Sequence, residues 1–266
     1  MSLKLRGYRR NGPEFIFRGV GGTGPPQREK ETQMVPILFY GVPEGCSFGS
    51  IVALEWLGRP YRLCRVAMPE VVSGPEYRRL NPVGETPTLL TEGGEVISES
   101  MAILNHIGAH AIDAGLAFPQ GSPGFDRLNE ALAFLNTSFF NAFSPLWYAL
   151  EHAADGPRQE ALVGYGRDLV ARAHAHLEAK LAGRDWLLGD RRSLADAYFA
   201  GIARWTDFHG VVDRGDYPAV DRLYRRLLDD PAVRFADAIE HGRPAASAGG
   251  FQGEVGLAEA LRLAGR

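Results

Sequence analysis

The sequence predicts two successive folded units, a compact α/β unit over residues 35–112 and an all-helical unit over residues 125–242. Three observations support this division. Strand-like and helical segments alternate in the first unit, helical segments alone follow in the second, and a glycine- and proline-rich linker, residues 113–124, separates them. Residues 1–34 show little periodicity and are predicted to be a flexible N-terminal extension, and residues 243–266 a C-terminal tail with a helical end.

The α/β unit is predicted from the order of its segments, β-α-β-α-β-β-α. It begins with a short apolar run typical of a buried strand, followed by apolar residues at helical spacing that end at Gly58, a helix stop signal. A hairpin is indicated where two short strands flank Gly93-Gly94. The predicted strands are residues 36–40, 61–66, 88–90 and 96–98, and the predicted helices are residues 47–57, 75–80 and 100–111.

The second unit shows helical patterns only. Asp230 before Pro231 is typical of a helix start, because the aspartate can cap the free N–H groups and proline suits the first helical position. The predicted helices are at about residues 125–152, 158–182, 193–209, 218–229 and 231–240.

The composition excludes several classes of partner. The 29 basic and 32 acidic residues give a net charge of −3, without the domain-scale basic excess of a nucleic-acid-binding protein. No apolar run approaches the roughly 18 residues of a membrane span. The chain has two cysteines, Cys46 and Cys64, which favours a reducing compartment over a secreted disulfide framework. We therefore expect a cytoplasmic protein without nucleic-acid or membrane partners.

Cys46 is the first candidate for chemistry. It lies between the first strand and the first helix, where the helix N-terminus favours the thiolate, although a small unreactive cysteine would fit the same position. A dithiol oxidoreductase needs a second cysteine three residues on, but that position is Gly49. Cys64 falls within a strand and is predicted to be a packing residue. A reactive Cys46 would therefore act on an external thiol.

Two further segments offer ligand contacts. Thr86-Pro87 precedes the hairpin; a cis bond there would present the Thr86 backbone to a peptide ligand, whereas a trans bond would make an ordinary turn. Glu99-Ser100 opens the third helix, where free N–H groups and a hydroxyl suit a carboxylate and Glu99 suits an ammonium group. Plain helix capping is the alternative for this pair.

These features together resemble the N-terminal domain of glutathione transferases, especially the bacterial beta class. The matching marks are the Gly45-Cys46-Ser47 turn, the loop from Asn81-Pro82 to Thr86-Pro87, and the Glu99-Ser100 pair. The resemblance extends over about residues 36–241. It implies a thioredoxin-like domain with a mixed four-stranded sheet, followed by an all-α helical bundle, in a homodimer.

The resemblance also implies roles for individual residues. Pro87 would follow a cis bond, and Thr86 would pair with the cysteinyl backbone of glutathione. Glu99 and Ser100 would hold the γ-glutamyl end. Cys46 would face the glutathione sulfur, with Cys46 and Ser47 as the catalytic candidates.

The helical unit partly follows the family pattern. Ser193 and Asp196 have capping-box spacing, similar to the folding motif of the transferase helical domain. Phe140, however, stands where beta-class proteins usually place a histidine, and the lysine expected after the second strand is absent. The same segment is rich in aromatic residues. Phe140, Phe143 and Trp147 are predicted to line a pocket for an apolar substrate, and the alternative is that they form core and dimer interface.

The sequence thus predicts an enzyme that transfers glutathione to an apolar electrophile or exchanges it with disulfides. The alternative is a non-catalytic glutathione-binding or regulatory protein, which the missing histidine favours. No metal is expected, because His174 and His176 are two residues apart and do not share a helix face.

Overall fold

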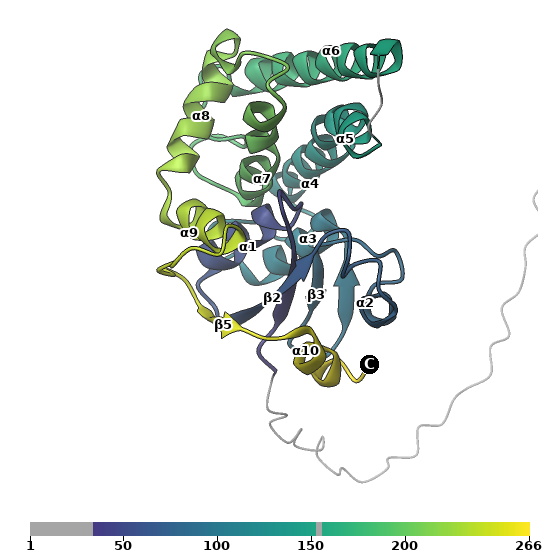
Figure 1. Cartoon of the computed structure of the whole chain (residues 1–266). Helices are drawn as coiled ribbons and strands as arrows, with labels where there is room; N and C mark the ends of the chain where they lie inside the picture. The colour runs from purple at the N-terminus through teal and green to yellow at the C-terminus, as the bar shows by residue number, and fades with distance from the viewer. Residues whose placement is uncertain (1–33, 153–155) are drawn as a thin grey trace, which may run out of the picture. The chain divides into compact units, whose positions relative to one another are not determined.

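The computed structural model describes residues 34–152 and 156–266 (Figure 1). Residues 1–33 of the predicted N-terminal extension lie outside the described residues. Within the described part of the chain, no helix combines the length and apolar character needed to cross a membrane.

The α/β unit contains every predicted element in the predicted order. Strand β1 (Ile37–Val42) runs parallel to β2 (Tyr61–Ala67) and antiparallel to β3 (Thr88–Leu90), which pairs with β4 (Val96–Ser98). The helices are α1 (Phe48–Leu57), α2 (Pro75–Leu80) and α3 (Ser100–His110). All residues of β1 are buried, because this strand lies inside the sheet with a partner on each side. The mixed sheet of the predicted thioredoxin-like domain is confirmed.

Within residues 34–152 and 156–266 the sheet has five strands, so the predicted count of four is wrong. Strand β5 (Phe251–Glu254) pairs in parallel with β2, and helix α10 (Leu257–Leu263) follows it (Figure 1). The predicted tail is therefore a packed part of the α/β unit, with the helical end in place. Its short, glycine-containing strand lacks a strong alternating pattern and gains its pairing from the β2 edge.

The Glu55 carboxylate of α1 fixes the segment that leads into β5. It accepts hydrogen bonds from the Ser247 hydroxyl at 2.7 Å and from the Ala248 and Gly249 backbone N–H groups at 3.1 and 3.0 Å. Gly250 then passes so close to the chain that a Cβ there would lie 1.8 Å from the carbonyl oxygen of Arg59. Only glycine fits this approach.

The second unit is helical throughout. Ser193 and Asp196 form the predicted capping box at the start of helix α7 (Leu194–His209). The Ser193 backbone N–H donates to the Asp196 carboxylate at 2.8 Å. The predicted helix over residues 125–152 is interrupted before Pro145 by a π-helical turn, η1 (Leu135–Phe140), and a 3₁₀ turn, η2 (Asn141–Phe143). The α-helices are α4 (Pro123–Phe134), α5 (Ser144–Glu151), α6 (Gly156–Leu181), α7 (Leu194–His209), α8 (Pro218–Leu228) and α9 (Pro231–Glu240).

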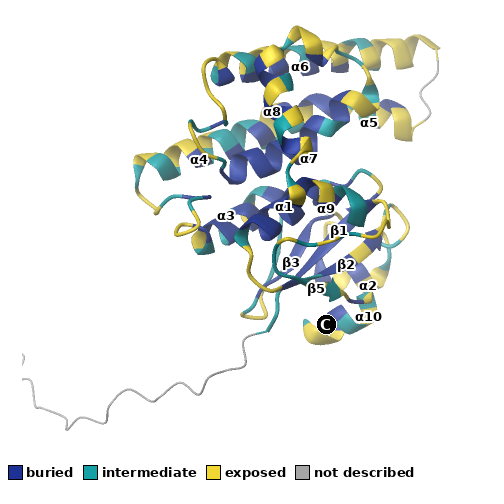
Figure 2. Cartoon of the chain, turned by 90° about the vertical axis from the view of Figure 1, so that its left-hand side faces the viewer, coloured by how far each residue is buried: buried dark blue, intermediate teal, exposed yellow. Residues whose placement is uncertain are grey.

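Helices α1 and α7 join the two units in one hydrophobic core. Figure 2 shows α1 and α7 mostly in the dark blue of buried residues. The α1–α7 contact depends on two glycines, since a Cβ on Gly49 would lie 2.8 Å from the Ala197 carbonyl oxygen and one on Gly201 would lie 2.9 Å from the Gly49 nitrogen. A second, smaller core contains Cys64, which is fully buried as predicted.

Candidate functional site

The loop between β1 and α1 carries Cys46. Cys46 is half-buried, whereas the next residue, Ser47, is only 1% exposed. The Ser47 hydroxyl accepts the Gly41 N–H at 2.9 Å, and its carbonyl accepts the N–H groups of Ser50 and Ile51 at 3.0 and 3.1 Å. Ser47 therefore ties the loop to β1 and starts α1. In this structure its hydroxyl is enclosed and is not presented to a ligand.

The electrostatics of Cys46 differ from the expectation that the helix N-terminus favours its thiolate. Burial, followed by the negative charge of Glu85, raises the pKa of Cys46 to about 12, and the positive charge of Arg204 offsets only part of this rise. Cys46 is therefore a neutral thiol at pH 7. The burial of Cys46 therefore opposes the thiolate that the helix N-terminus was expected to favour.

The loop before β3 places Thr86 beside the Cys46 loop. The Thr86–Pro87 peptide bond is cis, as the family resemblance implied. A Cβ on Gly41, near the end of β1, would lie 2.2 Å from the Thr86 side-chain oxygen, so the Thr86 loop touches the end of β1 that leads into the Cys46 loop. Neither the N–H nor the carbonyl of Thr86 has a hydrogen-bonding partner within residues 34–152 and 156–266. This backbone is free to pair with an extended ligand.

The loop conformation is held from outside the site. The Glu85 carbonyl accepts hydrogen bonds from the Tyr77 hydroxyl and the Asn81 side-chain amide, both at 2.8 Å. Both donors also contact the Thr88 hydroxyl. Asn81, which the sequence marked only as part of a family motif, thus anchors the residue just before Thr86.

Glu99 and Ser100 stand at the N-terminus of α3. Glu99 is exposed and has φ of 70° and ψ of 125°, a conformation that is unfavourable for a residue with a side chain. Ser100 is the first helical residue and is 6% exposed. Strained backbone of this kind persists where the surroundings enforce it, and it is concentrated at ligand-binding positions.

Tyr198 of α7 connects these segments and was missed in the sequence. Its hydroxyl donates to the Asn136 side-chain oxygen at 2.7 Å. Burial raises the pKa of Tyr198; the nearby Cys46, when ionised, and the Glu99 carboxylate act in the same direction, and the Ser100 side chain acts against them. The Tyr198 phenol is therefore close to both the Cys46 loop and the start of α3.

A buried ionic cluster of Glu44, Arg204 and Glu240 clamps the Cys46 loop. The Arg204 guanidinium donates to a Glu44 carboxylate oxygen at 2.7 Å, to a Glu240 carboxylate oxygen at 3.0 Å and to the Gly45 carbonyl at 2.9 Å. The Glu240 carboxylate in turn accepts the Gly45 N–H at 2.8 Å. Both backbone groups of Gly45 are thereby fixed next to Cys46.

The predicted pocket residues belong to an aromatic cluster beside this loop. The ring centroids of Phe140 and Trp205 are 5.2 Å apart, and those of Trp147 and Trp205 are 5.3 Å apart. The Trp205 indole N–H donates to the Glu44 carbonyl at 3.2 Å, which joins the cluster to the Cys46 loop. Phe140 and Trp147 are half-buried. Phe143 is 0% exposed and packs against Trp205, so it is a core residue in this structure and lines no open pocket.

Two buried polar atoms in the cluster lack partners. Within the described part of the chain, neither the Trp147 Nε1 atom nor the His209 Nε2 atom makes a hydrogen bond, and the two rings are 4.5 Å apart between centroids. Burial lowers the pKa of His209, which favours its neutral form. The Trp147 indole N–H is a hydrogen-bond donor whose own nitrogen atom is buried.

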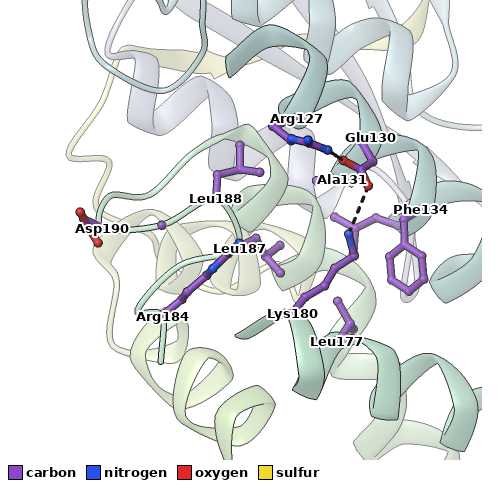
Figure 3. A pocket seen from close by; sticks show the side chains of 12 residues that line it. Arg127, Glu130, Ala131, Phe134, Leu177, Lys180, Arg184, Leu187, Leu188 and Asp190 are labelled. Atoms are coloured by element: carbon purple, nitrogen blue, oxygen red, sulfur yellow. Dashed lines mark hydrogen bonds and ion pairs between the residues drawn. The ribbon is translucent and has the colours of Figure 1, made fainter. Parts of the chain in front are cut away.

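A separate pocket of about 380 Å³ lies within the helical unit (Figure 3). Arg127, Glu130 and Lys180 form an ion-paired rim, with Arg127–Glu130 and Lys180–Glu130 nitrogen–oxygen distances of 2.6 and 3.5 Å. Apolar side chains, among them Leu187 and Leu188, form most of the remaining lining, and Arg184 and Asp190 complete it. None of the predicted site residues lines this pocket.

The comparisons with known proteins agree with this geometry. The family model of the glutathione S-transferase N-terminal domain matches residues 46–110, and that of the C-terminal domain matches residues 131–231. Glutathione S-transferase GST-4.5 of Xanthomonas campestris is 32% identical over 201 residues, which are 74% of this chain and 95% of the relative. Glutathione S-transferase GstA of Escherichia coli O157:H7 is 28% identical over 205 residues, 76% of this chain and 98% of the relative.

Solved structures give the same assignment. The glutathione S-transferase from Xylella fastidiosa superposes with a TM-score of 0.71 at 27% identity, covering 79% of this chain and 100% of that one. A sphingomonad glutathione S-transferase complexed with glutathione gives a TM-score of 0.67 at 30% identity, covering 77% and 98%. The fold and the site thus define a thioredoxin-like domain joined to a helical bundle. The chain belongs to the glutathione S-transferase family.

Proposed function

We propose that this protein binds glutathione between the Cys46 loop, Thr86 and the start of α3, and transfers it to an apolar electrophile. The observation that carries the proposal is the unpaired backbone of Thr86 at the cis proline, directly beside the Cys46 loop. A tripeptide needs such a strand-like partner for its central residue. The sphingomonad relative's structure is described as a complex with glutathione, which supports the same ligand here.

The two ends of the ligand have separate binding groups. The γ-glutamyl carboxylate would accept hydrogen bonds from the Ser100 hydroxyl and the free N–H groups of α3. The exposed Glu99 carboxylate would accept the γ-glutamyl ammonium group. The thiol of glutathione would then point toward Cys46. The tripeptide would extend from the start of α3, past Thr86, to the Cys46 loop.

Cys46 acts in this proposal as a hydrogen-bond donor. A thiol with a pKa of about 12 remains protonated at pH 7, so it can donate to a glutathione thiolate but is a poor nucleophile itself. Ser47 cannot take this role in the observed arrangement, since its hydroxyl is enclosed. Glutathione conjugation is therefore favoured over disulfide exchange, which requires a Cys46 thiolate.

The electrophile would bind against Phe140 and Trp147. These half-buried rings offer an apolar surface, with Phe143 behind them in the core. The same residues would exclude water from the attacking thiolate.

Assembly and location follow from the family and the composition. We propose a homodimer, to be tested by sedimentation at several protein concentrations. We also propose a cytoplasmic location and the unit boundaries at residues 35–112 and 125–242.

Isothermal titration with glutathione, followed by an assay with 1-chloro-2,4-dinitrobenzene, tests the function. Ser100→Ala is expected to weaken glutathione binding by about tenfold or more, the effect of losing a hydrogen bond to a charged group. Ser138→Ala, at an exposed serine of the helical unit, is the matched control and should leave binding unchanged. Cys46→Ala should lower turnover while glutathione still binds.

The outcomes separate the competing functions. Binding of glutathione without conjugation would favour the non-catalytic alternative, for which the replacement of the family histidine by Phe140 is the specific observation. Absence of glutathione binding would refute both readings. Equal binding by the Ser100→Ala variant would refute the proposed placement of the γ-glutamyl end.

A further inference from the structure

Three potential metal ligands meet at the opposite end of α3 from the glutathione site. Glu92 lies in the turn between β3 and β4, and His106 and His110 lie one helical turn apart on α3. The Glu92 carboxylate oxygens are 3.3 Å from His106 Nε2 and 2.8 Å from His110 Nε2. The three ligand atoms all lie within 4.8 Å of one another.

Local structure brings these side chains together. Histidines four residues apart project from the same helix face, so both rings point toward one neighbour. The hairpin turn that supplies Glu92 is closed by the Thr91 N–H, which donates to the Glu95 carbonyl at 2.8 Å, and by the Glu95 N–H, which donates to the Thr91 hydroxyl at 3.1 Å. The carboxylate therefore stands on a fixed turn over the α3 face.

We propose that Glu92, His106 and His110 form a binding site for a divalent transition metal ion of the Zn²⁺ type. Two imidazoles and a carboxylate are a preferred ligand set for Zn²⁺, with metal–ligand distances of about 2.0–2.2 Å. Tetrahedral geometry at those distances separates ligand atoms by about 3.3 Å. His106 Nε2 lies 3.3 Å from Glu92 Oε2 and His110 Nε2 lies 2.8 Å from Glu92 Oε1, and one ligand atom from each residue lies within 4.8 Å of the others, so side-chain rotations can bring the three atoms to this spacing.

The surroundings suit a site with an open coordination position. The side chains of Glu92, His106 and His110 are 20%, 28% and 33% exposed, so they are partly shielded yet accessible to an ion and to water. Burial alone would raise the pKa of Glu92, but its backbone hydrogen bond and the two histidines together lower it below its ordinary value. Glu92 is therefore the anionic ligand at neutral pH.

Arg59 contacts the ring nitrogen of His110 that faces away from Glu92. Its guanidinium nitrogen Nη1 is 3.0 Å from His110 Nδ1. Arginine can only donate, so His110 Nδ1 accepts and Nε2 carries the proton that faces Glu92. A metal ion can bind His110 Nε2 only when the proton on Nε2 leaves or moves to Nδ1. Arg59 opposes a proton on Nδ1, because its guanidinium already donates to that atom. Removing Arg59 should therefore tighten metal binding.

The test uses the full-length protein, stripped with a chelator and titrated with ZnCl₂ by calorimetry. We expect one ion per chain and at least about tenfold weaker binding in Glu92→Gln and His106→Gln, because each loses a direct ligand. His176→Gln changes an exposed histidine of α6 and should leave the affinity unchanged. Arg59→Ala should bind Zn²⁺ several-fold more tightly than the unaltered chain.

Two results would overturn the proposal. Unaltered Zn²⁺ affinity in both ligand variants would place the ion elsewhere. A Co²⁺ complex with a thiolate charge-transfer band that disappears in Cys46→Ala would assign the ion to the cysteine. If a ligand variant does not fold, two other measurements test the site: the Zn²⁺ affinity of Arg59→Ala, and the imidazole NMR signals of the unaltered chain. Zn²⁺ must shift the signals of His106 and His110. None of these readouts depends on glutathione.

Discussion

Replacing Arg204 with methionine should destabilise the protein by releasing the clamp on the Cys46 loop. The Arg204 side chain is 12% exposed, and that of its partner Glu240 is 5% exposed. The variant keeps the apolar stem that packs near the Phe48 ring, 4.5 Å from the guanidinium carbon. It leaves Glu240 buried with the Gly45 N–H as its remaining donor.

The expected loss follows from the fate of the Glu240 charge. Breaking a buried ion pair by removing one partner costs about 3–5 kcal/mol, because the other charge stays uncompensated. For a folded part of this size, about 3 kcal/mol lowers Tm by roughly 6–12 °C. The loss should be smaller at low pH. Burial already raises the pKa of Glu240, and the folded variant lacks the Arg204 charge that lowers this pKa. Glu240 in the folded variant therefore takes up a proton as pH falls, which removes the uncompensated charge.

Urea unfolding at one fixed protein concentration, at pH 7 and pH 5, measures this effect. Arg225→Met is the matched control, since Arg225 is 76% exposed in its pair with Asp221 and such pairs contribute about 0–1 kcal/mol. Adding Glu240→Gln to Arg204→Met should recover at least half of the loss, because the amide oxygen still accepts the Gly45 N–H without a charge.

A loss below about 1 kcal/mol for Arg204→Met would refute the reasoning, because it would mean that Glu240 is solvated without its partner. No recovery in the double variant would also contradict it. In that case the loss would come from packing and not from the stranded carboxylate.

Three other predictions concern separate parts of the molecule. His174 is fully buried, and burial lowers its pKa from 6.5 to about 4. The stability that the neutral ring contributes is complete above pH 6.5 and is lost as pH falls toward 4, by about 3 kcal/mol in all at about 1.4 kcal/mol per pH unit. In His174→Gln, the free energy of unfolding should therefore fall less steeply with decreasing pH. Phe140→His should raise the rate of conjugation to 1-chloro-2,4-dinitrobenzene by about tenfold or more, because the histidine would supply the missing hydrogen-bond donor beside the glutathione sulfur. An unchanged rate would place Phe140 away from the sulfur. Glu55→Leu removes the acceptor for Ser247, Ala248 and Gly249, so limited trypsin digestion should cleave after Arg262 earlier than in the unaltered chain. Equal cleavage rates would show that β5 pairing alone holds this segment.

Local patterns were sufficient to predict most of the fold. The apolar run at β1, the stop at Gly58 and the hairpin around Gly93-Gly94 depend on neighbouring residues and were predicted correctly. The Asp230 cap is also local: its side chain accepts the Ala232 N–H at 2.8 Å. Strand β5 was missed because its four residues gain their stability from the β2 edge, about 190 positions earlier in the chain.

The site was predictable only where family motifs mark it. Cys46, Thr86 and Glu99 stand at the expected positions, but the raised pKa of Cys46 depends on how deeply the fold buries it and on the charge of Glu85. No local pattern indicates that Arg204 reaches Glu44, which is 160 residues away. The His106–His110 spacing was visible, yet the hairpin that brings Glu92 over it appears only in the folded chain.

The pairing of β5 with β2 has a consequence for synthesis. The first four strands leave the ribosome long before residues 251–254, so the β2 edge, with its open row of N–H and carbonyl groups, stays unpaired while the helical unit is made. Until then, the partly made chain presents a template on which another nascent chain can add a strand. Residues 251–254 close that template when they emerge, so a ribosome that stalls before residue 251 releases a product prone to aggregation.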